Sequence, residues 1–227
     1  MAGAVIIGPG PASGRRSLAA SREKACPVAV VARSRETVDR AVAALEGASV
    51  ATLGLRADVT DEQALRGALN LAADAHGLPD VLVYNAGLIR SDRPGELSVR
   101  GHMEAWAINV VGAVTAAGHL GPRMAERGSG RIVITGGMPV PLPQATSLSL
   151  GKAGVRALTD LLGRVYGEAG VHVATVTVCG PVEPGTPFDP DDIAEHYWRL
   201  HAQSRDEWEH EVVHGRVEPV EGGRPSP

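Results

Sequence analysis

The sequence is poor in aromatic residues and in cysteine. Only 3% of its 227 residues are aromatic, with a single phenylalanine, so a core drawn from a hydrophobic fraction of 44% must consist mainly of Ala, Val, Leu and Ile. Such small and β-branched side chains are typical of buried parallel strands covered by closely packed helices. The two cysteines, Cys26 and Cys179, lie far apart and outside any CxxC spacing, which predicts free thiols in a reducing compartment.

Other missing patterns disfavour whole classes of protein. No apolar run reaches the length of a membrane span, and the N-terminus has no charged segment followed by a long apolar stretch. We therefore expect a cytoplasmic protein with no membrane association. The formal net charge of −4 gives no electrostatic basis for nucleic-acid binding. The histidines and acidic residues show no metal-ligand spacing, and the G-x-S-x-G elbow of a hydrolase is missing, so no metal site is predicted.

Short apolar runs alternate with longer helix-like segments along the chain. The predicted strands are residues 4–8, 28–32, 50–55, 80–84, 131–135, 171–178 and 211–214, and the predicted helices are residues 15–24, 35–45, 62–76, 101–127, 148–169 and 191–203. This alternation predicts an α/β fold, a single Rossmann-type doubly wound domain over residues 1–217, with a mostly parallel sheet of about seven strands flanked by helices. The Gly/Pro-rich residues 218–227 are expected to be a disordered tail.

A glycine-rich turn, GPGPASG over residues 8–14, follows the first predicted strand and leads into a helix. Glycine lets the backbone approach a pyrophosphate, and a helix N-terminus supplies amide donors and a favourable dipole. No G-K-[ST] closes the turn, so it is not a P-loop. Pro9 and Pro11 have no N–H to donate, which reduces the number of available amides. The predicted dinucleotide contacts in this turn are Gly8, Gly10, Ala12, Ser13 and Gly14.

The second predicted strand ends at Arg33 and Ser34. In a dinucleotide fold, this place meets the adenosine ribose, where an acidic residue favours NAD and an arginine pairs with the 2′-phosphate of NADP. Arg33 and Ser34 are therefore predicted to bind the cofactor, with NADP(H) preferred to NAD(H). The alternative interpretation is an exposed arginine that simply precedes the next helix.

Motifs in chain order resemble the short-chain dehydrogenase/reductase family over roughly residues 4–215. The turn at Gly8, Ala12 and Gly14 is similar to the family's TGxxxGxG motif, with Ile7 in place of its threonine and Ala12 in place of its middle glycine. The further matches are Asp58-Val59 to the adenine-contacting pair, Tyr84-Asn85-Ala86-Gly87 to NNAG, Asn109 to the helix asparagine, Lys152 to the lysine of YxxxK, Cys179-Gly180-Pro181 to the PG motif, and Thr186 to the threonine that touches the nicotinamide carboxamide.

The resemblance implies a set of site residues and an assembly. Catalytic roles are implied for Asn109 and Lys152. Cofactor contacts are implied for Asp58, Val59, Asn85, Ala86, Gly87, Lys152, Pro181 and Thr186. The family also forms homodimers or homotetramers through the two helices expected here at residues 101–127 and 148–169, so a homo-oligomer is expected.

The family's catalytic tyrosine has no counterpart, because the position four residues before Lys152 is Leu148. Thr135 stands at the offset of the family's carbonyl-polarising serine and is predicted to replace it as a catalytic residue. Hydride transfer to a carbonyl builds an alkoxide that a proton donor must meet, and leucine cannot donate. Ser147, Ser149 and Tyr84 are alternative donors, although a helix cap explains the serines and a buried strand position explains the tyrosine.

Three functions remain open from the sequence. The first is an NADP(H)-dependent oxidoreductase acting on a small carbonyl or alcohol substrate with a non-standard proton donor. The second is a non-redox dehydratase, isomerase or cyclase on the same fold. The third is a catalytically inactive binding or partner protein. The segment of residues 181–189 is too short for the helical lid usual in the family, and the open cleft that this implies, with the missing tyrosine, favours the second function.

Overall fold

The computed structural model describes residues 3–10, 26–46 and 50–216. The predicted helix at 15–24 and the predicted tail at 218–227 lie outside the described residues. So do three residues of the predicted cofactor turn, namely Ala12, Ser13 and Gly14.

Seven strands form a single sheet in the part of the chain that the structure describes, in the order β3-β2-β1-β4-β5-β6-β7. Their bounds are Ala4–Ile7 (β1), Val28–Ala32 (β2), Thr52–Arg56 (β3), Val81–Tyr84 (β4), Gly130–Thr135 (β5), Val171–Val178 (β6) and Glu211–His214 (β7). Every neighbouring pair is parallel. The predicted Rossmann-type, doubly wound fold is confirmed. The strand order reverses between β1 and β4, which is where a crevice for a ligand opens at the carboxyl ends of such sheets.

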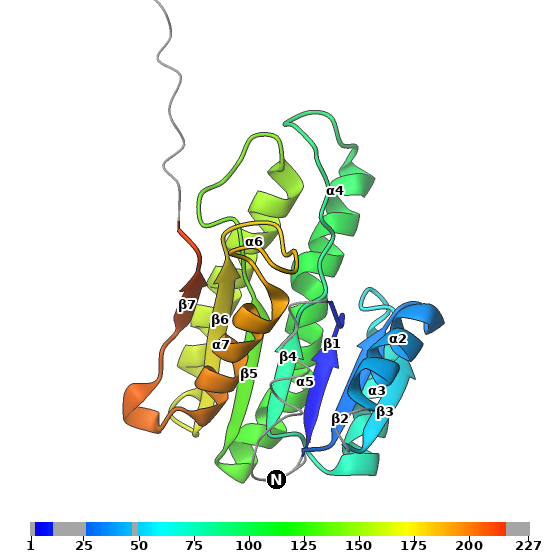
Figure 1. The fold of residues 1–227 in the computed structure, drawn as a ribbon, viewed down its shortest axis with the longest axis vertical. Helices are drawn as coiled ribbons and strands as arrows, with labels where there is room; N and C mark the ends of the chain where they lie inside the picture. Colours follow the sequence, from blue (N-terminus) through cyan, green and yellow to red (C-terminus); the bar gives the residue numbers. More distant parts are fainter. Residues whose placement is uncertain (1–2, 11–25, 47–49, 217–227) are drawn as a thin grey trace, which may run out of the picture.

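Helices cover both faces of the sheet (Figure 1). Their bounds are Arg35–Glu46 (α2), Glu62–His76 (α3), Val99–Trp106 (α4), Gly112–Arg127 (α5), Thr146–Tyr166 (α6) and Pro190–Ala202 (α7), with a π-helical turn at Ala107–Val111 (η1) and a 3₁₀ turn at Arg205–Glu207 (η2). The sequence predicted one continuous helix at 101–127. The structure instead inserts η1 between α4 and α5, and such π-helical turns are frequent at functional sites.

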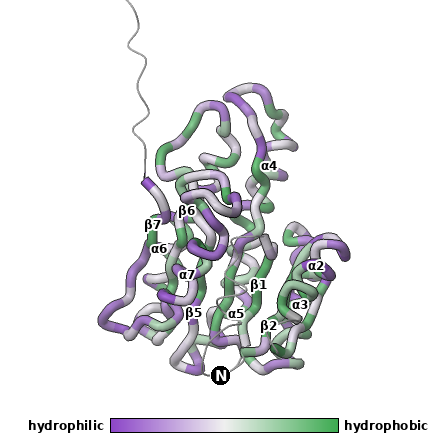
Figure 2. Tube along the Cα trace, in the orientation of Figure 1, coloured by the Kyte–Doolittle hydropathy of each residue, from purple (hydrophilic) through white to green (hydrophobic). Residues whose placement is uncertain are grey.

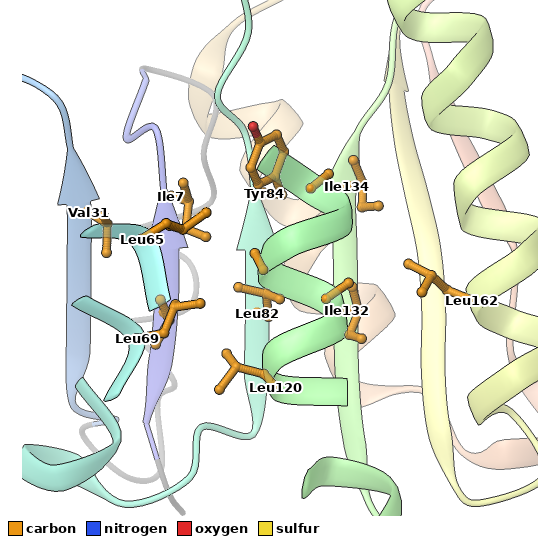
Figure 3. Packing of buried hydrophobic residues seen from close by; sticks show 14 of the residues in the cluster. Ile7, Val31, Leu65, Leu69, Leu82, Tyr84, Leu120, Ile132, Ile134 and Leu162 are labelled. Atoms are coloured by element: carbon orange, nitrogen blue, oxygen red, sulfur yellow. The ribbon is translucent and has the colours of Figure 1, made fainter. Parts of the chain in front are cut away.

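Two apolar cores lie on opposite faces of the sheet. On one face, Leu65 and Leu69 of α3 lie beside Ile7 and Val31, whereas Leu120 of α5 and Leu162 of α6 lie on either side of Ile132 in β5, as Figure 3 shows. On the other face, Val133 belongs to a second cluster that includes residues of α2 and α7. Figure 2 shows hydrophobic residues gathered along the central strands. Because side chains alternate along a strand, the residue after Ile134 must point to the α7 face.

Asp189 accepts a hydrogen bond from the Asp191 N–H at 2.8 Å, and Pro190 takes the first position of α7. This cap starts α7 one residue before the predicted helix of residues 191–203. Within the described residues, no helix combines the length and apolar character that crossing a membrane requires.

Candidate active site

The turn after β1 lies directly against the segment after β4. Gly8 has a left-handed φ of 71°, and a Cβ atom there would come within 2.5 Å of the backbone N of Ala86. Only glycine fits both constraints. Ile7 accepts a hydrogen bond from the Asn85 N–H at 2.8 Å. The structure therefore brings together Gly8, Asn85 and Ala86, three residues that the sequence assigned to the cofactor.

The Asn85 side chain joins the ends of three strands. Its Nδ2 donates to the Gly8 carbonyl at 2.7 Å, and its Oδ1 accepts from the Thr135 hydroxyl at 2.8 Å. A Cβ atom on Gly10 would lie 3.0 Å from Asn85 Nδ2, so the described part of the glycine-rich turn passes close to this amide. The amide therefore fixes the start of the turn relative to β4 and β5.

The Thr135 hydroxyl points to the α7 face, where it lies 2.6 Å from the hydroxyl of Tyr197. Lys152 lies on α6, on the opposite face of the sheet. It bonds to the backbone of Thr135 and not to its hydroxyl: Lys152 Nζ donates to the Thr135 carbonyl at 2.7 Å. The sequence placed the Thr135 hydroxyl as a polariser of the substrate carbonyl. The alternation of side chains along β5 directs that hydroxyl away from Lys152, so its position supports a structural role.

Lys152 is partly buried at the carboxyl end of β5. Burial, with a smaller contribution from the nearby Arg156 guanidinium, lowers the pKa of Lys152 to about 8. Arg156 donates to the carbonyl oxygens of Gly137 at 3.0 Å and Met138 at 3.4 Å. Gly137, in the loop after β5, faces the aliphatic part of Lys152: a Cβ atom on Gly137 would lie 3.7 Å from Lys152 Cε. No side chain there competes for the ammonium.

Asn109 lies beside Lys152, in the π-helical turn η1. Its Oδ1 accepts from the Leu88 N–H at 2.8 Å, and a Cβ atom on Gly87 would lie 3.4 Å from this oxygen and 4.0 Å from Lys152 Nζ. The Asn109 Nδ2 is buried and has no hydrogen-bond partner among the described residues. A buried donor without a partner is unusual in a folded protein, and a water or ligand atom within hydrogen-bond reach would satisfy it. Asn109, Gly87 and Lys152 are thus gathered as the sequence predicted.

The backbone of η1 engages the Tyr84 hydroxyl. Its hydroxyl donates to the Ile108 carbonyl at 2.5 Å, and a Cβ atom on Gly112 would come within 2.3 Å of the same hydroxyl. Burial raises the pKa of Tyr84 well above its usual range. The side chain therefore supports η1 and is not available as an acid at neutral pH.

The two serines that flank Leu148 are both engaged locally. Ser147 donates from its hydroxyl to the buried Asp92 carboxylate at 2.6 Å, and Ser149 accepts from the Leu142 N–H at 3.0 Å. These contacts fix the start of α6 against the preceding loops. Leu148 itself is buried, with 8% of its surface exposed. None of the three side chains supplies a free proton donor.

The carboxyl ends of β2 and β3 carry exposed arginines. Arg56 donates from Nε to the backbone carbonyl of Arg33 at 3.3 Å, so both side chains start from one edge of the sheet. Ser34 caps α2, its hydroxyl accepting from the Thr37 N–H at 3.2 Å. Arg33 and Ser34 were predicted from the sequence as cofactor contacts, whereas Arg56 was not, although it stands at the end of the next strand.

Asp58 and Val59 follow β3. Thr60 donates to the Asp58 carboxylate from its backbone N–H at 2.9 Å and from its hydroxyl at 2.8 Å. These bonds, the backbone one foremost, lower the pKa of Asp58, and the charge of Arg33 lowers it further. Val59 packs near Gly112, whose Cβ would lie 3.0 Å from the Val59 Cβ. Asp58 and Arg33 are therefore close enough to interact electrostatically.

The segment between β6 and α7 forms turns and no helix. Thr186 donates to the Glu183 carbonyl at 2.8 Å and accepts from the Phe188 N–H at 3.1 Å, so its hydroxyl organises the segment. Pro181 is exposed at the start of the segment. The hydrogen bonds of Thr186 stay within this segment and do not join it to Lys152. Across the residues that can be described, no group of three His, Cys, Asp or Glu side chains has the arrangement of a metal site.

Comparison with known proteins identifies the family. The model of the short chain dehydrogenase family matches residues 3–191. The chain is 31% identical to cis-4-hydroxycyclohexanecarboxylate dehydrogenase of Sinomonas cyclohexanicum, over 82% of this chain and 77% of that protein. It is also 31% identical to D-threitol dehydrogenase of Mycolicibacterium smegmatis, over 77% and 69%.

Solved structures share the fold. A short-chain dehydrogenase from Rhodopseudomonas palustris superimposes with a TM-score of 0.82 at 22% identity, covering 96% of this chain and 99% of that one. An alcohol dehydrogenase from Thermococcus sibiricus, solved in complex with 5-hydroxy-NADP, gives a TM-score of 0.81 at 23% identity, covering 95% and 98%. Because the family model matches residues 3–191, which is most of this chain, the chain belongs to the short-chain dehydrogenase family.

Proposed function

We propose that the protein is an NADP(H)-dependent oxidoreductase that interconverts a small carbonyl compound and its alcohol, with Lys152 as proton donor. The observation that carries the proposal is the Lys152 ammonium, fixed by the Thr135 carbonyl at 2.7 Å and gathered with Asn109 and Gly87. Leu148, at the family's tyrosine position, has no proton to give. The named relatives act on a hydroxycyclohexanecarboxylate and on threitol, which supports a small hydroxy compound as substrate.

The residues present fit a nicotinamide dinucleotide. At Gly8 the backbone passes too close to Ala86 for any residue with a Cβ atom. Asn109 has a buried amide donor without a partner among the described residues. Arg33 is exposed after β2, where the 2′-phosphate is expected. When bound, the reduced nicotinamide supplies the hydride. The solved alcohol dehydrogenase with 5-hydroxy-NADP supports NADP(H) by analogy. Predicted contacts from Asp58, Val59, Pro181 and Thr186 remain part of the proposal.

The proton step belongs to Lys152. As the substrate carbon gains a hydride, its oxygen becomes an alkoxide, and the Lys152 ammonium transfers one proton to that oxygen. The lysine is left as a neutral amine and regains its proton from solvent. A pKa near the working pH is what an acid of this kind requires, because it must both hold and release the proton.

The pH dependence of carbonyl reduction tests this role. The pKa of Lys152 is lowered to about 8, so the lysine carries its proton below that pH and loses it above. We expect kcat for reduction to be high at neutral pH and to fall as the pH rises through about 8, with the opposite trend for alcohol oxidation. Stopped-flow single turnovers across the pH range measure the effect.

Arg156→Gln is the matched control for the pH profile. Removing this positive charge raises the pKa of Lys152, so the falling limb of the profile should move to higher pH. A limb that stays in place in the variant, with normal cofactor affinity, would show that another group controls the rate.

Cofactor choice depends on Arg33. We expect Arg33→Ala to weaken NADPH binding by about tenfold to a hundredfold, since a charge-assisted hydrogen bond contributes about 1.5–3 kcal/mol, and to leave NADH binding unchanged. Fluorescence titration with both nucleotides measures this. Arg35→Ala is the control, because Arg35 is also exposed but pairs with Asp39 at 3.5 Å. Equal losses for both nucleotides in the Arg33 variant would count against NADP(H).

A homodimer or homotetramer is part of the proposal. Large apolar side chains are exposed on α4 and α6, including Met103 at 67% and Leu150 at 56%. Together with Trp106 and Val111 they line one apolar hollow between these elements. A contiguous apolar surface of this kind marks an interaction site.

The free cysteines Cys26 and Cys179 support the proposed cytoplasmic location.

A further inference from the structure

A line of hydrogen bonds connects α7 to the turn after β1. The Tyr197 hydroxyl lies 2.6 Å from Thr135 Oγ1, Thr135 Oγ1 donates to Asn85 Oδ1 at 2.8 Å, and Asn85 Nδ2 donates to the Gly8 carbonyl at 2.7 Å. These four residues come from α7, β5, the end of β4 and the end of β1. The line therefore links the C-terminal third of the chain to the first residue of the glycine-rich turn.

One arrangement of protons satisfies every contact in the line. The Gly8 carbonyl can only accept, so the Asn85 nitrogen faces it and the Asn85 oxygen faces Thr135. Thr135 must then donate to Asn85, which leaves the Thr135 oxygen to accept from the Tyr197 hydroxyl. All the bonds point the same way, from Tyr197 to Gly8. Hydrogen bonds aligned in this manner polarise and strengthen one another.

Packing alone does not account for the Tyr197 hydroxyl. The side chain is fully buried, with 0% of its surface exposed, in a cluster with Val133, Ile193 and Leu200. Burying a hydroxyl costs free energy unless a hydrogen bond compensates, and phenylalanine would fill the same space without that cost. The contact to Thr135 supplies the compensation. In the sequence, Tyr197 is only an aromatic residue within the predicted helix of residues 191–203.

We infer that Tyr197 is a positioning residue for the cofactor, an inference that rests on the proposed function. Its hydroxyl orients Thr135, Thr135 orients the Asn85 amide, and the amide holds the Gly8 carbonyl where the backbone enters the left-handed φ of 71°. Without the hydroxyl, Thr135 can turn its proton elsewhere and the Asn85 amide loses its fixed orientation. The Gly8 carbonyl, at the start of the predicted cofactor turn, is then less preorganised, and ligand affinity falls because binding must fix it.

Tyr197→Phe is the direct test, with NADPH affinity measured by fluorescence titration. One neutral hydrogen bond contributes about 0.5–1.5 kcal/mol, so we expect NADPH to bind about threefold to tenfold more weakly. Thr159→Val is the matched control. It removes a buried hydroxyl that bonds to Thr175 and Val155 on the α6 face, away from Gly8, and should leave the affinity unchanged after a similar loss of thermal stability.

Variants of Thr135 separate positioning from general destabilisation. Thr135→Ser keeps the hydroxyl and should retain the wild-type affinity, whereas Thr135→Val keeps the shape and should weaken NADPH binding as Tyr197→Phe does. If Tyr197→Phe does not fold, this pair alone decides the question. Wild-type protein that binds no NADPH would refute the proposed function itself. Wild-type binding with equal affinities in the folded hydroxyl-deletion variants would overturn only the role of Tyr197.

Discussion

Replacing Lys152 with methionine should lower kcat for carbonyl reduction by about 10²–10⁴-fold, the usual effect of removing a positioned acid. Methionine keeps the length and apolar stem of the lysine, so the packing against Gly137 is preserved. The ammonium that donates to the Thr135 carbonyl and carries the transferable proton is lost. Single-turnover rates at saturating NADPH measure the effect, and a separate titration corrects for any loss of cofactor affinity.

Lys152→Arg distinguishes proton transfer from charge. Arginine is always protonated near neutral pH and cannot release its proton, yet it keeps the positive charge. If Lys152 acts as the acid, the arginine variant should be nearly as slow as the methionine variant. A rate close to the wild type would instead show that the charge alone stabilises the developing alkoxide.

Leu148→Tyr should accelerate carbonyl reduction by up to about a hundredfold, the lower end of the range for a positioned acid. Leu148 precedes Lys152 by one helical turn of α6, so a phenol there lies on the same face as the ammonium. The neighbouring positive charge lowers the phenol pKa and makes it a competent donor. The gain is limited because Leu148 is buried and the larger ring must displace neighbouring atoms.

Leu148→Phe is the control for this gain. It adds a ring of the same shape without the hydroxyl, so its rate should not exceed the wild type. A tyrosine variant no faster than the phenylalanine variant would show that the missing phenol is not what limits the reaction. A pH profile that shifts only in the tyrosine variant would confirm that the proton donor has changed.

The fold could be predicted from the sequence because its signals are local. Each strand is a short apolar run between polar or glycine boundaries, and the alternation with helices dictates a parallel sheet. The helix boundaries were less certain: α6 begins at Thr146, two residues before the predicted start, because Asp92 accepts from the Ser147 N–H at 3.0 Å. That contact joins residues 55 positions apart, and no local pattern reports it.

The candidate site was predicted in part. Gly8, Asn85, Gly87, Asn109 and Lys152 gather as expected, because each follows a strand or sits on a helix at the same edge of the sheet. The direction of the Thr135 hydroxyl was not predictable, since one residue of offset moves a side chain to the other face of a strand. Tyr197 was not predicted either, because its contact with Thr135 forms only where α7 packs against the end of β5, and the two residues lie far apart in the sequence.

The central claim is hydride transfer from NADPH, and isotope transfer tests it most directly. The protein should be incubated with NADPH that carries deuterium in its transferable position, together with a panel of small ketones and aldehydes, and the products analysed by mass spectrometry. We predict an alcohol with a single deuterium on the former carbonyl carbon, formed by the wild type and by Leu148→Tyr, and formed about 10²–10⁴-fold more slowly by Lys152→Met. NADPH that binds tightly while no product gains deuterium would contradict the account.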